Sequence, residues 1–400
     1  MTLDADIACI LDGADPTRKP PMPPNAIRAP IDPKPARIEL PDPIPASQLG
    51  EGDAIDWVWH GYIAREHVTL LSGIWKGGKT TLLSRLIQIM GDGGELAQPV
   101  EAGRVLIVSE ESKSLWANRR DELNIGDHAE FLCRPFKGRP ALRDWIGFVE
   151  HIARLIRERK YSVIVLDTIA ALLPCDNEND ASKMLTALAP LHTWTEAGAG
   201  VLLAHHPRKG DAGEAQAARG SGALPGFVDI ILELRRFDAS RREDRRRTLT
   251  AYSRFDETPD ELVIELTDEG YRAVGTKGDA RQTDRLGVIR EILRADEPGM
   301  TAAEVRDAWP EGDGIPRPGK RTIENDLKHG ASAGSWAMSG SGKKGNPYRF
   351  RLPNAIRAGS TSLGARNELG GDNPDAVTQA VIEYAESSPS QGRDAIGRQI

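Results

Sequence analysis

Short apolar runs alternate with amphipathic segments between residues 67 and 275. A strand that is apolar along its whole length is buried on both faces, which is typical of a parallel sheet covered by helices. The pattern therefore predicts an α/β domain over residues 51–276. The expected strands are 67–72, 105–108, 163–166, 201–204 and 228–232, with antiparallel strands at 247–252 and 261–266, and the expected helices are 81–92, 141–159 and 181–197.

Residues 281–352 are expected to form a separate unit. An amphipathic helix is predicted at 283–295, the capping box Thr301–Glu304 opens a second short helix, and a third begins at Lys320. Two strands around the glycine-rich loop 339–346 follow. Because three helices followed by a hairpin resemble a winged helix-turn-helix, a DNA-binding domain is expected here.

The two ends of the chain are expected to be disordered arms. Residues 1–50 are rich in proline, which favours an extended chain without a core, and residues 353–400 are polar and rich in glycine. The hexapeptide Pro-Asn-Ala-Ile-Arg-Ala occurs in both arms, at 24–29 and 353–358, and we have no physical account of this repeat.

Composition and charge narrow the classes of protein. The 400-residue chain has a net charge of −7, so any affinity for nucleic acid must come from a local site. The sequence contains no apolar run of about 18 residues and no signal peptide, and its three scattered cysteines form neither a disulfide framework nor a metal knuckle. A cytoplasmic protein without membrane association is expected.

The segment Gly73–Thr80 matches the phosphate-binding loop G-x-x-x-x-G-K-[ST], and it lies between an expected strand and an expected helix. Its glycines let successive backbone N–H groups point inward, and the helix N-terminus adds partial positive charge. Lys79 is expected to reach the β- and γ-phosphates of ATP, and Thr80 is expected to offer its hydroxyl to Mg²⁺. The predicted nucleotide-binding residues are Gly73, Ile74, Trp75, Lys76, Gly77, Gly78, Lys79, Thr80, Thr81 and Asp167.

Asp167 follows four apolar residues at the end of an expected central strand. An aspartate at the carboxyl end of such a strand lies beside the phosphate loop and can hold Mg²⁺ through water. Thr80 and Asp167 are therefore the predicted metal ligands. Two further carboxylates, Glu110 and Glu111, end the strand predicted at 105–108.

In their order along the chain these motifs resemble the RecA-like AAA family ATPases of plasmids and mobile elements, a family that includes the replicative helicase RepA. The resemblance covers roughly residues 55–275. It rests on the phosphate loop, the strand-ending Glu110 and Glu111, the strand Val163–Asp167 and the segments 201–209 and 218–224. It implies a RecA-like P-loop ATPase domain that uses ATP and Mg²⁺.

The resemblance also implies roles for individual residues. Glu111 matches the catalytic base that activates water, with Glu110 as the alternative. His206 or His205 matches the residue at the end of the fourth strand that contacts the γ-phosphate or the attacking water.

Relatives of this fold hydrolyse the nucleotide between subunits, where an arginine of the neighbouring subunit reaches the γ-phosphate. Arg219, in a glycine-rich loop, and Arg254, in a late strand, are the two alternatives for this role. Tyr252 stands where hexameric helicases often carry the lysine of Lys-x-Arg, so the two-cation arrangement is incomplete. Either arginine implies a homo-oligomer, for which we expect a hexameric ring.

Residues 314–352 carry eight basic and two acidic side chains, a local net charge of +6 in an acidic chain. Such a patch is the electrostatic footprint of nucleic-acid binding, and a solvated basic face on a protein-binding winged helix is the alternative. The candidate DNA-binding residues are Lys320, Arg321, Lys343, Lys344 and Arg349.

Together these patterns favour an ATP-dependent, ring-forming DNA motor or helicase of a mobile genetic element. Single-stranded DNA would pass through the ring, and the winged helix would bind duplex DNA. An ATP-switched DNA-binding regulator or replication initiator without unwinding activity is the main alternative, and a recombination-type filament ATPase is a third.

Overall fold

The computed structural model describes residues 42–48, 54–74, 76–206, 222–241, 243–312 and 314–353. The chain divides into two compact units, residues 1–55 and 56–400, and the described part of the first contains one short 3-10 helix, η1 (Ala46–Gln48). The predicted disordered arms, and the repeated hexapeptide within them, lie almost wholly outside the described residues.

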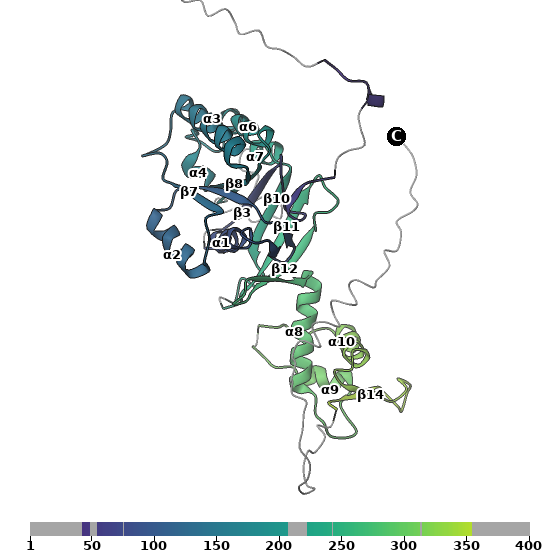
Figure 1. Ribbon diagram of the computed structural model, residues 1–400. Coiled ribbons are helices and arrows are strands. Elements are labelled where there is room, and N and C mark those ends of the chain that lie inside the picture. Colours follow the sequence, from purple (N-terminus) through teal and green to yellow (C-terminus); the bar gives the residue numbers. More distant parts are fainter. Residues whose placement is uncertain are drawn as a thin grey trace, which may run out of the picture. The chain divides into compact units, whose positions relative to one another are not determined.

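A nine-stranded sheet forms the centre of the second unit (Figure 1). Its strands are β3 (Val68–Gly73), β6 (Arg104–Ser109), β7 (Ala129–Cys133), β8 (Tyr161–Asp167), β9 (Gly200–His205), β10 (Ile230–Arg236), β11 (Arg246–Ser253), β12 (Glu261–Leu266) and β13 (Tyr271–Gly275). Their order is β13-β12-β11-β10-β3-β9-β8-β6-β7. The strands from β10 to β7 are parallel, and β11, β12 and β13 extend the sheet in antiparallel fashion.

Helices cover both faces of the parallel strands, each over its own apolar cluster (Figure 1). Leu82 and Trp116 belong to the first cluster, and Trp145 and Trp194 belong to the second. This arrangement confirms the predicted α/β class. The helices are α1 (Lys79–Ile89), α2 (Lys113–Leu123), α3 (Leu142–Arg159), α4 (Ile169–Leu172), α5 (Ala181–Leu188), η2 (Ala189–Leu191), α6 (His192–Glu196) and α7 (Ala223–Phe227).

The prediction of one helix over residues 181–197 is wrong, because α5, η2 and α6 divide this segment. Pro190 lies in η2, where its ring and missing N–H do not allow an α-helix to continue. The strands β7 and β13 were not predicted. Both are edge strands of the sheet and only partly buried, so neither has a continuous apolar run.

A small sheet packs beside the main one and contains the aromatic residues that precede the phosphate loop. Its strands, β1 (Trp57–Trp59), β2 (Ile63–Ala64), β4 (Gly94–Glu95) and β5 (Pro99–Val100), have the order β2-β1-β5-β4. Trp59 is buried, and its indole N–H donates to the carbonyl of Leu96 at 3.1 Å. Trp59 therefore packs in the core.

The C-terminal segment has an apolar cluster of its own. Its elements are α8 (Lys277–Ile292), α9 (Ala302–Asp307), α10 (Lys320–Ser332), β14 (Ala337–Ser339) and β15 (Arg349–Arg351). The predicted capping box of Thr301 and Glu304 is confirmed, and a second one, Thr276 with Asp279, makes α8 begin before the predicted residue 283. Gly330 allows α10 to touch the ring of Trp336, because a Cβ there would lie 2.1 Å from an indole carbon.

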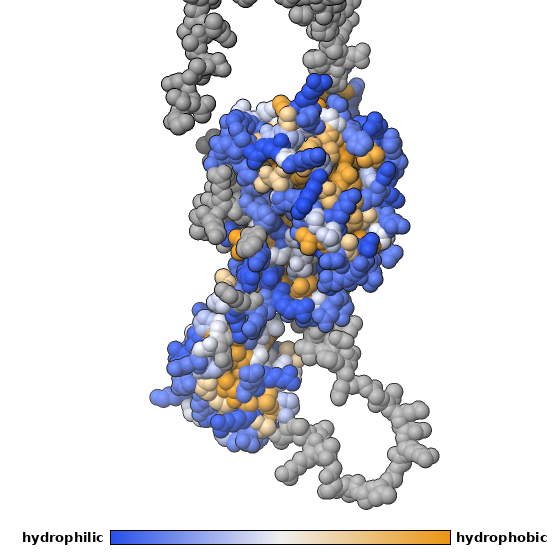
Figure 2. Space-filling view, turned by 90° about the vertical axis from the view of Figure 1, so that its left-hand side faces the viewer, coloured by the Kyte–Doolittle hydropathy of each residue, from blue (hydrophilic) through white to orange (hydrophobic). Residues whose placement is uncertain are grey.

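A groove of about 670 Å³ follows the edge strand β7 between α2 and α3. Its apolar lining includes Trp116, Phe131 and Leu155, and its polar lining includes Arg120 and Arg159. Figure 2 views the molecule from the side that carries α2, α3 and β7, where hydrophobic surface shows among hydrophilic residues. Among the described helices, none is long and apolar enough to cross a membrane.

Candidate nucleotide site

The order of the strands brings the predicted site residues to one edge of the sheet. β3 leads into the phosphate loop, β8 ends at Asp167, and β9 lies between them and ends at His205. Ser72 is paired with His205, and Asp167 is paired with Ala204 on one side and Ser109 on the other. Parallel strands have their carboxyl ends at the same edge, which is where open α/β sheets bind ligands.

The phosphate loop turns directly into α1, which begins at Lys79. The N–H of Gly77 donates to the carbonyl of Ile74 at 3.0 Å, and Gly78 has a φ of 107°, which a residue with a side chain rarely adopts. The first N–H groups of a helix have no partner within the helix, so they face the loop and can bind anions. Thr80 is half-buried, and Thr81 and Ile74 are exposed. Trp75 lies outside the described residues.

Lys79 lies inside this loop with only 4% of its surface exposed. Its ammonium donates to the carbonyls of Gly73 and Ile74 and to Nδ1 of His206, the last at 2.7 Å. Burial lowers the pKa of Lys79 to about 8, and the charge of Asp167 opposes that shift. The lysine is therefore held at the loop by groups that phosphate oxygens could replace.

Asp167 is 5% exposed and is surrounded by charge of both signs. Burial raises its pKa to about 6, the charges of Glu111 and Glu110 add to this, and Lys79 and Arg119 act against it. A divalent cation would relieve this concentration of negative charge. Among the described residues, no three His, Cys, Asp or Glu side chains form a ready metal site. Mg²⁺ fits these residues because it is commonly held by one or two carboxylates together with phosphate oxygens and water.

The two glutamates after β6 have different surroundings. Glu111 forms a two-fold ion pair with Arg119 of α2, in which Nη2 lies 3.0 Å from Oε1. The guanidinium of Arg119 also lies over the ring of Trp116, 4.7 Å from its centre. Glu110 is exposed, and its carboxylate accepts from the hydroxyl of Thr168 at 3.3 Å. Both carboxylates lie close enough to Asp167 for their charges to raise its pKa.

The family resemblance implies that Glu111 is the base, so the substitution Glu111→Gln is expected to slow ATP hydrolysis by about 10²-fold or more while nucleotide binding persists, because the amide cannot accept a proton from water. Single-turnover hydrolysis and equilibrium binding measure these two effects separately. Glu110→Gln provides the comparison and should lose less than about 5-fold. If Glu110→Gln loses hydrolysis and Glu111→Gln retains it, Glu110 is the base instead of Glu111.

The neighbouring histidines His205 and His206, at the end of β9, have different surroundings. His206 accepts from Lys79, and burial followed by the charge of Lys79 lowers its pKa, so it is held neutral beside the phosphate loop. His205 is buried on the other face, where its Nε2 lies 3.7 Å from Glu178 and its Nδ1 has no hydrogen-bond partner among the described residues. Of the two, His206 is the one that contacts the lysine of the phosphate loop.

Of the two arginines predicted to act between subunits, Arg254 lies among the described residues. Arg219 lies outside the described residues. Arg254 has 68% of its side chain exposed and lies 3.5 Å from Asp229, whose carboxylate accepts from the N–H of Val68 at the start of β3. Arg254 is thus at the edge of the sheet opposite to the phosphate loop.

Sequence reasoning missed two arginines of this region, Arg119 and Arg247. Arg119 pairs with Glu111, and Arg247 of β11 donates from Nε to the carbonyl of Gly77 at 2.9 Å. Arg247 belongs to the basic run 241–247, and composition does not reveal which position of such a run faces the loop. No local signal in the sequence identifies either contact.

A glycine loop between β3 and α1, a buried lysine within it and a carboxylate at the end of β8 define the fold and site of a P-loop nucleotide-binding domain. Residues 34–212, a little less than half of the chain, match the family model described as an AAA domain. The match supports an AAA-type ATPase, which implies nucleotide binding and hydrolysis, and the parallel-rich sheet fits a RecA-like domain of this class. A search of curated proteins finds no match.

Proposed function

We propose that this chain is an ATP-hydrolysing DNA motor of a mobile genetic element or plasmid replication system, similar to RepA. The observation that carries the proposal is the convergence of Lys79, Asp167 and Glu111 at one edge of the sheet. Burial and the neighbouring glutamates raise the pKa of Asp167, and the charge of Lys79 acts against this rise. A site of this kind suits a phosphate anion with a divalent cation.

Several residues of the chain would each have a separate role in phosphoryl transfer. Lys79 would bind the β- and γ-phosphates, and Thr80 and Asp167 would hold Mg²⁺, which neutralises phosphate charge when bound. Glu111 would accept a proton from water as the water oxygen bonds to the γ-phosphorus and the bond to the β-phosphate oxygen breaks. Because Glu111 is paired with Arg119, it must leave that pair to act as the base. His206 would orient the water or the γ-phosphate.

We infer that the active form is a homo-oligomer, for which a hexameric ring is the expected form. Positive charge at the γ-phosphate stabilises the transition state, and a neighbouring subunit is a common source of it. The exposure of Arg254, and its place at the edge opposite to the phosphate loop, support a role on a second copy. Arg219 remains the alternative.

The C-terminal unit is proposed to be a winged helix that binds duplex DNA. Its three helices and the β14–β15 pair support this assignment. Lys320 and Arg321 are exposed at the start of α10, and Lys343 and Lys344 are exposed in the loop between the two strands. Arg349 instead donates to the carbonyl of Gly299 at 2.8 Å, so it is the least available of the five candidates.

Reversing two charges in this loop tests the DNA-binding assignment. The double substitution Lys343→Glu and Lys344→Glu is expected to weaken duplex binding and to reduce the slope of log K against log salt by about 2, because two phosphate contacts are lost. Fluorescence anisotropy at several salt concentrations measures both. Lys137→Glu with Lys160→Glu, two exposed lysines of the ATPase domain, provides a control of equal charge change. Unchanged affinity in the loop variant would point to a protein partner instead.

The alternative function is an ATP-switched DNA-binding regulator or replication initiator. The ion pair of Glu111 with Arg119 favours it, because Glu111 must leave Arg119 before it can accept a proton from water. ATP turnover measured without DNA, with single strands and with duplex, together with unwinding of a forked duplex, separates the two. The motor predicts turnover stimulated by single strands and an unwound fork. Sequence-specific duplex binding with an intact fork would support the regulator.

A further inference from the structure

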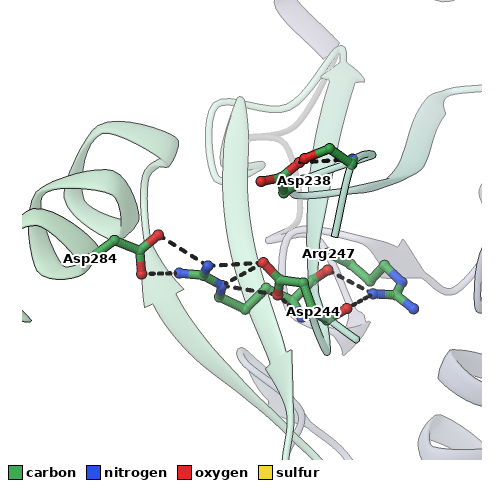
Figure 3. A network of polar contacts seen from close by, with 6 residues as sticks. Asp238, Asp244, Arg247 and Asp284 are labelled. Carbon is green, nitrogen blue, oxygen red and sulfur yellow. Dashed lines mark hydrogen bonds and ion pairs between the residues drawn. The ribbon is translucent and has the colours of Figure 1, made fainter. Parts of the chain in front are cut away.

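Arg247 connects the antiparallel part of the sheet to the phosphate loop. It lies in β11, which pairs with β10, the strand next to β3. Its Nε donates to the carbonyl of Gly77 at 2.9 Å. Its Nη1 donates to the carbonyls of Asp244 and Arg246 at 2.9 and 2.7 Å, which fixes the direction of the guanidinium (Figure 3).

The contact with Gly77 sets the direction of a backbone N–H group in the phosphate loop. The carbonyl of Gly77 and the N–H of Gly78 belong to one planar peptide unit and point in opposite directions. A donor that holds the carbonyl of Gly77 therefore also sets the direction of the Gly78 N–H. Gly78 is the residue before α1, where backbone N–H groups bind phosphate. A Cβ on Gly78 would lie 3.4 Å from Nε of Arg247, so the arginine packs directly on this peptide.

The neighbouring Arg246 fixes this end of β11 to α8. Its guanidinium binds the carboxylate of Asp284 at 2.7 and 3.0 Å and the carboxylate of Asp244 at 2.9 to 3.3 Å (Figure 3). It also lies 4.2 Å from the centre of the Phe237 ring. The Arg246 and Asp244 side chains are 14% and 8% exposed, so solvent screens this pair much less than a surface pair. Arg246, whose backbone carbonyl accepts from Arg247, is therefore tied through its side chain to Asp284 of α8.

We propose that Arg247 is a positioning residue of the nucleotide site, acting on the Gly77–Gly78 peptide from within the same protomer, and that Asp284 of α8 supports it through Arg246. This inference rests on the proposed binding of ATP at the loop. It adds to the site a residue that none of the sequence motifs contains, and it makes the first helix of the C-terminal segment part of the support for nucleotide binding.

The test compares variants of the full chain in equilibrium binding of a fluorescent ATP analogue and in steady-state hydrolysis. Arg247→Ala is expected to weaken binding and raise KM about 10-fold, which is the effect of one lost charge-assisted hydrogen bond, and to leave kcat within about 3-fold. Arg247→Lys should recover part of the affinity, because lysine can reach one carbonyl but not three. Asp284→Asn should weaken binding by about 3-fold, since it acts through Arg246.

The neighbouring pair Arg245 and Asp268 provides matched controls. These side chains lie 3.5 Å apart on the surface and are 54% and 92% exposed, and Arg245→Ala and Asp268→Asn should bind nucleotide as the wild type does. Equal affinity of Arg247→Ala and wild type would overturn the inference and leave the proposed ATPase function intact. A fall in kcat without a change in KM would overturn it as well. If wild type binds no nucleotide, both the inference and the proposed function are wrong. Should Arg247→Ala not fold, the same criteria apply to Arg247→Lys and Asp284→Asn.

Discussion

Replacing Lys79 by alanine is expected to abolish measurable ATP turnover, a loss of about 10²–10³-fold or more. The side chain is 4% exposed and is held by the carbonyls of Gly73 and Ile74 and by His206. Its removal takes a buried cation out of the loop and leaves these acceptors without their donor. Both effects weaken the attraction for the β- and γ-phosphates, so binding and hydrolysis fall together.

The measurement for Lys79→Ala is phosphate release at saturating ATP, together with equilibrium nucleotide binding. Lys137→Ala is the control, because Lys137 is exposed and lies outside the loop. A thermal melt of each variant excludes loss of the fold as the cause. Normal turnover by a folded Lys79→Ala variant would show that Gly73–Thr80 is not the phosphate-binding loop.

Replacing Asp167 by asparagine is expected to have two opposite effects. Mg²⁺-dependent hydrolysis should fall by about 10²-fold or more, because the neutral amide is a poor ligand for the cation. The nucleotide-free protein should become more stable at pH 8. Burial and the nearby glutamates raise the pKa of Asp167 from 3.8 to about 6, so the native state is destabilised when this carboxylate is ionised. The difference corresponds to a free energy on the order of 2–3 kcal/mol.

The pH dependence gives the sign of this effect. An aspartate whose pKa is raised by folding binds its proton more tightly in the native state, so its ionisation reduces stability as the pH rises from about 4 through 6. Above pH 6 the reduction is complete, and below pH 4 it is absent. The gain in Tm of Asp167→Asn over wild type, measured in EDTA without nucleotide, should therefore be several degrees at pH 8 and should vanish near pH 4.

Two outcomes would contradict this account of Asp167. A variant with full Mg²⁺-dependent turnover would show that the metal is held elsewhere. A gain in Tm that is the same at pH 4 and pH 8 would show that the carboxylate is not destabilised by burial. Asp144→Asn, at an exposed carboxylate in the first turn of α3, provides the control for both measurements.

The α/β class and the chemistry of the loop follow from local sequence. Apolar strands, amphipathic helices and the glycine loop are short-range patterns, and the structure places α1 directly after Gly78 as the motif requires. The carboxyl ends of parallel strands meet at one edge, so Asp167 and the carboxylates after β6 could be placed near the loop without coordinates.

The remaining features depend on contacts between distant residues. The helix predicted over 181–197 fails at Pro190, and the edge strands β7 and β13 were missed because partial burial removes the apolar signal. Arg247 lies 170 residues from Gly77, and its role depends on the antiparallel register of β10 and β11. A single sequence does not encode that register in any local pattern.

Equilibrium binding of ATP to the full chain, measured by titration calorimetry with Mg²⁺ and with EDTA, tests the central claim most directly. The structure predicts saturable binding of one nucleotide per chain, tighter with Mg²⁺ than with EDTA, and lost in Lys79→Ala. Binding that is absent from wild type, or that is unaffected by Mg²⁺ and by Lys79→Ala, would contradict the claim that the edge of the sheet beside β3 holds a metal-bound triphosphate.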